Sequence, residues 1–235
     1  MIDVHCHMLP GVDDGSKNVD MSLEMIRMSA DQGVTGICFT PHFYADMNSP
    51  EEFIARRDNA LKLLESRLGE LPVVPEYTTG AEVHYFRGIS RSSSIESLCI
   101  GKSNYILIEM PFRTWQPYII EEIEELSEVS GLNIIIAHIE RYLSQDKKLV
   151  RRIIDNPILL KQCNAEFFIE RTAGKAFKML KKGEIDLLGS DSHNLGSRHP
   201  NLIEASDIID KKFKTDVLSG IWNNGRMLMD SAKGW

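Results

Sequence analysis

Histidine, aspartate and glutamate side chains recur where the apolar runs of this sequence end. The chain opens with MIDVHCHMLPGVDDG, in which a predicted strand carries Asp3, His5 and His7 on one face. Each such residue is weak evidence alone, since a strand histidine is often half-buried and a buried glutamate is often held by a salt bridge. Their repetition at six strand ends indicates one dispersed metal site. After His5 and His7, the candidates are His42, Glu82, Glu109, His138, Asp191 and His193.

The candidate ligands outnumber what one metal ion needs. With Asp14 they reach nine side chains, whereas a mononuclear site uses about four. A carboxylate such as Glu82 can bridge two ions about 3.5–4 Å apart, with a hydroxide nucleophile formed between them near neutral pH. Imidazole and carboxylate without thiolate favour manganese, iron or zinc over a cysteine-type structural zinc site. The sequence leaves the choice among these three metals open.

Two arginines follow predicted ligands closely. Arg141 lies three residues after His138, and Arg198 lies five residues after His193. A guanidinium carries a permanent charge and a fork of donors that suits a phosphate. Either arginine alone is compatible with a surface salt bridge, but beside a multinuclear site the pair indicates a phosphoester substrate.

Three residues near these motifs are assigned to structure. Cys6 alternates away from His5 and His7, so it is expected in the outer core. His84 is compatible with a supporting contact, but its place just past a strand favours an exposed loop, and His199 before a proline favours the surface. The C-x5-R signature of thiol phosphatases follows none of the four cysteines. No cysteine nucleophile is predicted.

Alternating strands and helices are expected to position the candidate ligands. About seven strand–helix repeats without a linker imply parallel strands. An open doubly wound sheet and a closed barrel both fit, and in a barrel the strand ends meet at one mouth. No G-x-G-x-x-G or G-x-x-x-x-G-K motif supports a nucleotide fold. Strands are predicted at 1–8, 34–40, 73–83, 104–110, 132–139, 158–168 and 185–193, and helices at 19–32, 50–68, 117–130, 147–156, 174–183, 201–212 and 214–230.

Composition narrows the class of protein. A chain of 235 residues suits a single domain, taken as 1–235, and a net charge of −7 argues against general nucleic-acid or anionic-membrane binding. Neither a signal peptide nor a run of about 20 apolar residues is present, so no membrane insertion is expected. The cysteines are isolated, which predicts buried free thiols in a reducing cytoplasm. They are Cys6, Cys38, Cys99 and Cys163.

Several motifs occur together in an order that resembles a known superfamily. They are HCHMLPGVDDG, TPH, GAE, IEM, AHIERY and SDSHNLGSR. From residue 2 to about residue 230 the sequence resembles the polymerase-and-histidinol-phosphatase (PHP) superfamily. Within it, the sequence is similar to the bacterial manganese-dependent protein-tyrosine phosphatases of capsule and exopolysaccharide operons. The segments 86–103 and 164–184 are idiosyncratic beside such relatives, which leaves their role in substrate binding open.

The resemblance implies a distorted (β/α)7 TIM-like barrel with up to three ions, manganese first, with iron and zinc as alternatives. It assigns one ion to His5, His7, Glu82 and Asp191, a second to Glu82, Glu109 and His138, and a third to Asp14, His42 and His193. Arg141 and Arg198 would bind the phosphate. The implied substrate is the tyrosine-rich tail of an autophosphorylated bacterial kinase that controls polysaccharide synthesis. Oligomeric state stays open.

The resulting hypothesis is one-step hydrolysis of phosphotyrosine by a metal-bound hydroxide. The phenolate needs little protonation to leave, so no general acid is assigned. One alternative is a PHP phosphatase of a small phosphomonoester such as histidinol phosphate. Another is a non-catalytic, metal-stabilised scaffold that binds phosphoproteins. A nuclease is disfavoured by the negative charge, and an amidohydrolase by Glu109 at the strand end where a lysine is typical.

Overall fold

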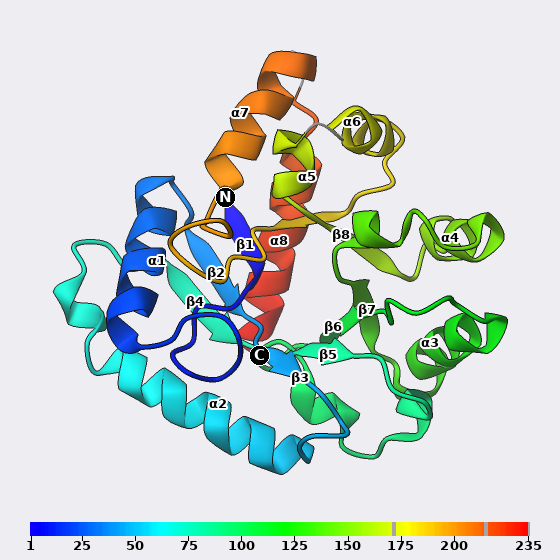
Figure 1. The fold of residues 1–235 in the computed structure, drawn as a ribbon, viewed down its shortest axis with the longest axis horizontal. Coiled ribbons are helices and arrows are strands. Elements are labelled where there is room, and N and C mark those ends of the chain that lie inside the picture. Colours follow the sequence, from blue (N-terminus) through cyan, green and yellow to red (C-terminus); the bar gives the residue numbers. More distant parts are fainter. Residues whose placement is uncertain (171–172, 214–215, 235) are drawn as a thin grey trace.

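The computed structural model describes residues 1–170, 173–213 and 216–234. Within these ranges the protein is an α/β domain built on parallel strands (Figure 1). The strands pair in two sets, in the orders β1-β2-β4 and β3-β5-β6-β7-β8-β9. Their bounds are β1 Ile2–Cys6, β2 Gly36–Phe39, β3 His42–Phe43, β4 Glu76–Thr79, β5 Glu82–His84, β6 Tyr105–Glu109, β7 Asn133–Ile136, β8 Leu160–Asn164 and β9 Leu187–Gly189.

The two sets of strands form one continuous curled sheet. Strands β2 and β3 are halves of one extended segment, as are β4 and β5, which confirms the broken strand expected within 73–83. Backbone hydrogen bonds from Gly80 to Phe39 and from Glu82 to Pro41 carry the pairing across both interruptions. The expected parallel α/β domain is therefore confirmed at the level of a curled parallel sheet.

Helices surround this sheet, and the last one lies on its inner side. In Figure 1, α8 lies near the centre of the molecule, whereas α1, α2, α3, α4, α6 and α7 lie around the periphery. The bounds are α1 Val19–Asp31, α2 Pro50–Glu65, α3 Pro117–Ser130, α4 Lys147–Ile154, α5 Glu166–Ile169, α6 Ala173–Lys181, α7 Leu202–Phe213 and α8 Ser219–Ala232. Short 3-10 turns follow at Leu68–Glu70, Ile89–Arg91, Ile95–Leu98 and Ile139–Tyr142.

Local sequence signals explain where the helices begin and end. Ser49 and Glu52 form a reciprocal capping box ahead of Pro50, which opens α2. Helix α3 begins at a proline and ends at Gly131, which adopts the left-handed conformation that suits a helix C-terminus. Because these signals are local, both helices are found close to the positions that the sequence predicts.

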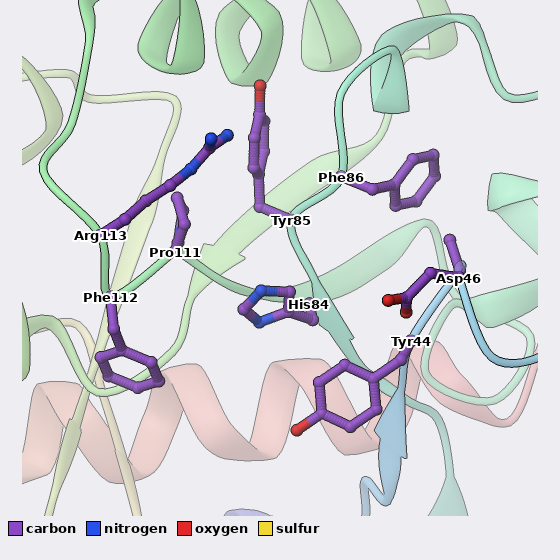
Figure 2. Close-up of a pocket in the computed structure, with 9 residues that line it drawn as sticks. Tyr44, Asp46, His84, Tyr85, Phe86, Pro111, Phe112 and Arg113 are labelled. Atoms are coloured by element: carbon purple, nitrogen blue, oxygen red, sulfur yellow. The ribbon is translucent and has the colours of Figure 1, made fainter.

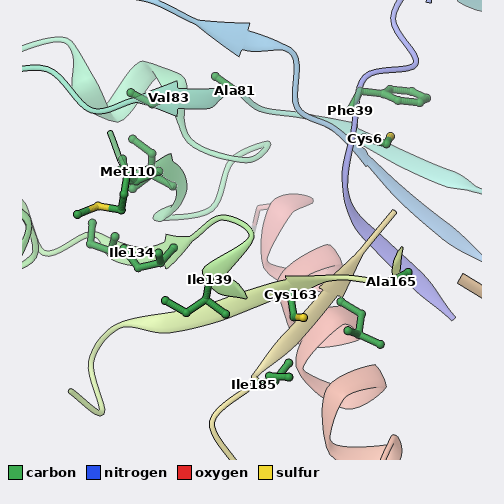
Figure 3. Close-up of a cluster of buried hydrophobic side chains, with 14 of the residues drawn as sticks. Cys6, Phe39, Ala81, Val83, Met110, Ile134, Ile139, Cys163, Ala165 and Ile185 are labelled. Carbon is green, nitrogen blue, oxygen red and sulfur yellow. The ribbon is translucent and has the colours of Figure 1, made fainter. Parts of the chain in front are cut away.

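Two hydrophobic clusters stabilise the domain. The larger one lies between the outer face of the sheet and the helices, and Figure 3 shows part of it, including Cys6 beside Phe39. In the smaller cluster, Leu228 and Met229 of α8 pack with strand residues such as Ile2 and Leu107. One face of α8 thus covers the apolar part of the sheet's inner side. None of the described helices has the length and apolarity needed to cross a membrane.

Two expected strands and the last expected helix have different bounds in the structure. The strand expected at 158–168 ends at Asn164, because Glu166–Ile169 turn into the short helix α5. The strand expected at 132–139 ends at Ile136 and is followed by a 3-10 turn. The last helix begins at Ser219 rather than 214, and positions 214 and 215 lie outside the described residues.

A further correction concerns the first strand. Asp3 pairs with Ile37 and Cys6 pairs with Phe39, so β1 holds one more residue than β2 over this stretch. This bulge places Asp3 on the Cys6 face, because neighbouring residues of paired strands share a face. The expectation that Asp3 shares a face with His5 and His7 is therefore wrong.

Candidate metal centre

The carboxyl ends of the strands bring the predicted ligands together. Most of them are buried, whereas His42 is half-buried and the Asp14 side chain is 65% exposed. Three groups have ligand atoms that all lie within 4.8 Å of one another. These groups are His7, Asp14, His42 and His193; His5, His7 and Glu82; and His42, Glu82 and Glu109. The arrangement is one continuous cluster, since the groups share members.

Glu82 lies at the centre of the cluster. Its Oε2 is 3.3 Å from Nε2 of both His5 and His7 and 2.9 Å from His42 Nδ1. Its Oε1 is 2.8 Å from His138 Nε2. A carboxylate with imidazole nitrogens around both oxygens has the position that a bridging ligand needs.

The remaining members extend the cluster on two sides. Asp14 Oδ1 is 3.5 Å from His42 Nε2 and 3.4 Å from His193 Nε2. On the other side, His138 Nε2 is 3.4 Å from Glu109 Oε1. Asp191 Oδ1 lies 3.7 Å from His5 Nε2. All nine predicted ligands therefore belong to one cluster, while their division among individual ions stays a prediction.

The backbone is strained at two of these positions. His138 and Asp191 have φ angles of 32° and 50°, and they are the non-glycine residues with positive φ in the described chain. Such conformations are costly and are retained where surrounding structure enforces them, commonly at functional sites. The Asp191 N–H donates to the His5 carbonyl at 2.8 Å, and the His138 N–H donates to Gln162 Oε1 at 2.7 Å.

The donor set fits divalent cations. Three buried atoms of the cluster have no hydrogen-bond partner in the described chain, namely His42 Nδ1, Glu82 Oε2 and His193 Nε2. His42 Nδ1 and Glu82 Oε2 are close, but their orientation does not make a hydrogen bond. A buried polar atom left without a partner is costly, and bound cations would supply the partners that these atoms lack.

Burial and pairing within the cluster lower the pKa values of some predicted ligands and raise those of others. Burial alone would raise the pKa of Glu82, but the charge of His5 and the hydrogen bond with His138 hold it well below its usual range. Burial would lower the pKa of His138, but hydrogen bonds with Glu109 and Glu82 raise it to about 9. Burial lowers the pKa of His193 to about 4, and the charge of His7 adds to this. Glu82 is therefore ionised, which is the form in which a carboxylate binds a metal ion.

Both predicted phosphate-binding arginines reach the cluster. Arg141 Nη2 donates to Asp191 Oδ2 at 2.5 Å, and Arg198 Nη2 lies 2.7 Å from Asp191 Oδ1. Their side chains remain 35% and 32% exposed, whereas Asp191 is buried. Each guanidinium is therefore held at the edge of the site and can also face a ligand from solvent.

Sequence reasoning missed several residues that orient the ligands. Asp13 Oδ2 is 2.6 Å from His7 Nδ1 and accepts the His42 N–H at 3.0 Å. Gln162 Oε1 is 3.1 Å from His5 Nδ1. Tyr142 Oη is 3.1 Å from His138 Nδ1. Asp13 and Tyr142 lie in the DDG and HIERY motifs, in which the sequence predicts roles for Asp14, His138 and Arg141 alone.

His84 also has a different role from the one expected. Its Nδ1 lies 2.8 Å from Glu109 Oε2, and its side chain is 31% exposed. The prediction of an exposed loop residue is wrong, because His84 is the last residue of β5 and its pairing with Glu109 in β6 points its ring toward the site.

The cysteines take no part in the cluster. All four are buried and free, as expected. Cys6 donates its thiol to the Cys38 carbonyl on the outer side of the sheet. Burial, followed by the nearby Asp3 charge, raises the pKa of Cys6 well above its usual value. A thiol of this kind is a poor nucleophile.

These features define the class as an α/β protein whose curled parallel sheet carries a histidine–carboxylate centre at the carboxyl ends of its strands. The family described as "Capsular polysaccharide synthesis, CpsB/CapC" matches residues 1–230. The chain belongs to this CpsB/CapC family.

Individual relatives agree with this assignment. The chain is 31% identical to the tyrosine-protein phosphatase CpsB of Streptococcus pneumoniae, covering 98% of this chain and 99% of the relative. It is 28% identical to the tyrosine-protein phosphatase YwqE of Bacillus subtilis, covering 97% and 91%. A solved chain from crystal structures of these two proteins, described as "unique metal-dependent tyrosine phosphatases", superposes with a TM-score of 0.82 at 25% identity, covering 98% of this chain and 95% of that one.

Proposed function

We propose that this protein is a metal-dependent protein-tyrosine phosphatase that acts in capsular polysaccharide synthesis. The observation that carries the proposal is the convergence of nine histidine and carboxylate side chains, together with two arginines, at one end of the sheet. Relatives of nearly equal length, named tyrosine-protein phosphatases, support the same activity.

The metal centre would be held as the sequence motifs suggest. We assign one ion to His5, His7, Glu82 and Asp191, a second to Glu82, Glu109 and His138, and a third to Asp14, His42 and His193. Manganese is the proposed ion, supported by a donor set of imidazole and carboxylate without thiolate. When bound, such ions activate water and neutralise the negative charge of the phosphoryl group.

The protein's own groups then position the substrate. Arg141 and Arg198 would each direct one edge of the guanidinium to the phosphate oxygens while a second contact anchors it to Asp191. Asp13 and Gln162 accept hydrogen bonds from His7 and His5 and so fix which ring nitrogen faces the centre. The phenolate leaving group departs without a dedicated acid, because it is far less basic than an alkoxide.

The fold proposed for this site is a distorted seven-stranded barrel. Counting β2 with β3 and β4 with β5 gives seven strands among the described residues. The β1–β9 edge is supported by a Cys6–Ser192 bridge and by the His7 N–H donating to the Ser192 carbonyl at 2.9 Å. In such a barrel the predicted ligands face one mouth.

The biological setting is proposed from the family. An autophosphorylated bacterial tyrosine kinase would present its phosphotyrosines to the mouth, in the cytoplasm, where such a kinase tail lies. The kinase substrate and the cytoplasmic location both go beyond the family description, which names capsular polysaccharide synthesis.

Metal reconstitution tests the proposed activity. The purified chain is stripped with a chelator, loaded singly with manganese, iron, cobalt or zinc, and assayed on phosphotyrosine peptide, phosphoserine peptide and histidinol phosphate. We expect manganese to restore hydrolysis, with phosphotyrosine preferred. Variants His5→Ala and His138→Ala should lose metal and activity together, while His199→Ala, outside the cluster, should retain its metal. A loaded protein that hydrolyses no phosphomonoester would favour the scaffold alternative.

A further inference from the structure

A cavity of about 530 Å³ adjoins the metal centre (Figure 2). Its lining includes Tyr44, His84, Tyr85, Phe86 and Phe112. Sites for small ligands commonly measure about 300–1,000 Å³ and are lined by aromatic and apolar groups with a few polar ones. This cavity is therefore large enough for one side chain of a substrate together with a short piece of its backbone.

Two residues that line the cavity connect it to the cluster. The Tyr44 ring lies 5.4 Å from the His42 ring and 5.4 Å from the His84 ring. His84 in turn contacts Glu109 at 2.8 Å. A group bound between Tyr44 and His84 is thus separated from the predicted ligands by a single ring.

Phe112 forms the opposite wall. Its ring stacks on that of His138, with centroids 6.1 Å apart and planes 20° apart. In Figure 2 the rings of Phe112 and Tyr44 lie on either side of His84. Two aromatic walls therefore flank a gap that opens beside the centre.

The exposure of Phe112 is unusual for this protein. Its exposed fraction is 57%, and every other phenylalanine, tyrosine or tryptophan in the described ranges is buried or half-buried. Phe112 belongs to neither hydrophobic cluster. An aromatic ring held in solvent beside a polar centre is well placed to receive an apolar group from a ligand.

We infer that this cavity binds the phenyl ring of phosphotyrosine and that Phe112 selects aryl over alkyl phosphoesters. The inference rests on the proposed phosphatase activity and adds the part of the site that recognises the leaving group. In phosphotyrosine the phosphate oxygen is bonded directly to the ring, so a phosphate held by Arg141 and Arg198 leaves the ring immediately beside the centre. A serine side chain is too small to contact both aromatic walls.

The test compares substrates in the manganese-loaded full chain. The variant Phe112→Leu removes the ring but keeps an apolar side chain, and Phe112→Tyr restores a ring. We expect Phe112→Leu to lower kcat/KM for a phosphotyrosine peptide by about 2- to 10-fold, the range of aromatic pair contributions, and to change kcat/KM for the matched phosphoserine peptide less than 2-fold. Phe112→Tyr should recover the phosphotyrosine value.

A matched control addresses the neighbouring cavity. Met47, 72% exposed, lines a second cavity of about 280 Å³ beside Asp13 and Asp14. Met47→Ala should leave the ratio of the two kcat/KM values within 2-fold of the parent. If Met47→Ala lowers the phosphotyrosine value and Phe112→Leu does not, the ring enters the other cavity and the inference is overturned.

Two further measurements distinguish recognition of the substrate ring by Phe112 from a role of Phe112 in supporting the His138 ring. Bound manganese should be equal in Phe112→Leu and the parent. Saturation-transfer NMR with phenylphosphonate, which is not hydrolysed, should show ring contacts that weaken in Phe112→Leu. Equal loss on both peptides together with lost metal would show that Phe112 only supports His138. A parent protein that hydrolyses neither peptide would instead refute the proposed function. The NMR experiment distinguishes that result from a failure of this inference, because it detects binding of the ring without hydrolysis.

Discussion

At the scale of single residues, the centre depends on groups that hold its ligands in place. Asp13 accepts hydrogen bonds from the His7 ring and from two backbone N–H groups, those of Gly15 and His42. Its pKa lies well below the usual range, since the hydrogen bond and charge of His7 outweigh burial, which alone would raise it. Asp13 is thus an anchor for the loop as well as for the imidazole.

Replacing Asp13 tests this anchoring. We expect Asp13→Asn to weaken manganese binding by about 10- to 100-fold, the effect typical of residues that orient metal ligands. A metal titration by calorimetry measures it, with circular dichroism to confirm the fold. Asp20→Asn, at a surface side chain that is 78% exposed, is the matched control. Equal manganese affinity in Asp13→Asn and the parent would show that Asp13 does not orient the predicted ligands.

Cys6 provides the converse prediction. It lies between two predicted ligands in sequence, yet its thiol faces the outer cluster and donates to Cys38. Cys6→Ser should therefore keep kcat/KM within about 2-fold, with a stability cost of about 1 kcal/mol for a polar group in an apolar site. A folded Cys6→Ser protein without activity would contradict a mechanism that uses no thiol.

At the scale of elements, the site depends on close approach of the first and last strands. A Cβ on Gly189 of β9 would lie 2.6 Å from the His5 Cβ of β1 and 3.0 Å from Gln162 Nε2. Only glycine lets β9 lie this close to the strand that carries His5.

This contact gives a prediction for Gly189→Ala. We expect it to lower the free energy of unfolding by about 1–3 kcal/mol, as overpacking does, and to reduce bound manganese because His5 must move. Urea denaturation and metal analysis measure the two effects. Gly174→Ala on α6, where an added Cβ meets nothing within 4 Å, should change stability by less than about 1 kcal/mol. If Gly189→Ala and Gly174→Ala have the same stability and the same bound manganese, the close approach of β1 and β9 limits neither property.

At the scale of the whole molecule, the centre ties distant parts of the chain together. The nine predicted ligands run from His5 to His193, and α8 closes the inner side of the same sheet. Any ion held by residues from several strands binds the folded chain and not the unfolded one, so it must stabilise the fold.

Metal binding should therefore raise the melting temperature. At a free manganese concentration 100-fold above Kd, the linkage amounts to about 2.7 kcal/mol. Thermal melts over a manganese titration measure it, and the double variant His5→Ala/His138→Ala should respond far less. A melting temperature independent of manganese in the parent would contradict a centre assembled by the fold.

Local sequence patterns predict most of the elements and the set of candidate ligands. Helix and strand positions followed from local periodicity and capping, as at α3, whose bounds matched the predicted 117–130. The ligand types and their places at strand ends were also local, and so were the two arginines. These features were readable because each depends on residues close together in the chain.

How these side chains face one another depends on tertiary contacts. The bulge in β1, which turns Asp3 away from His5 and His7, arises from its register with β2. The left-handed backbone at His138 and Asp191 is enforced by neighbouring segments, and His84 meets Glu109 only because β5 pairs with β6. The cavity beside Phe112 likewise forms from loops distant in sequence. Register, strain and cavities depend on contacts between segments far apart in the chain, and local sequence pattern carries no information about such contacts.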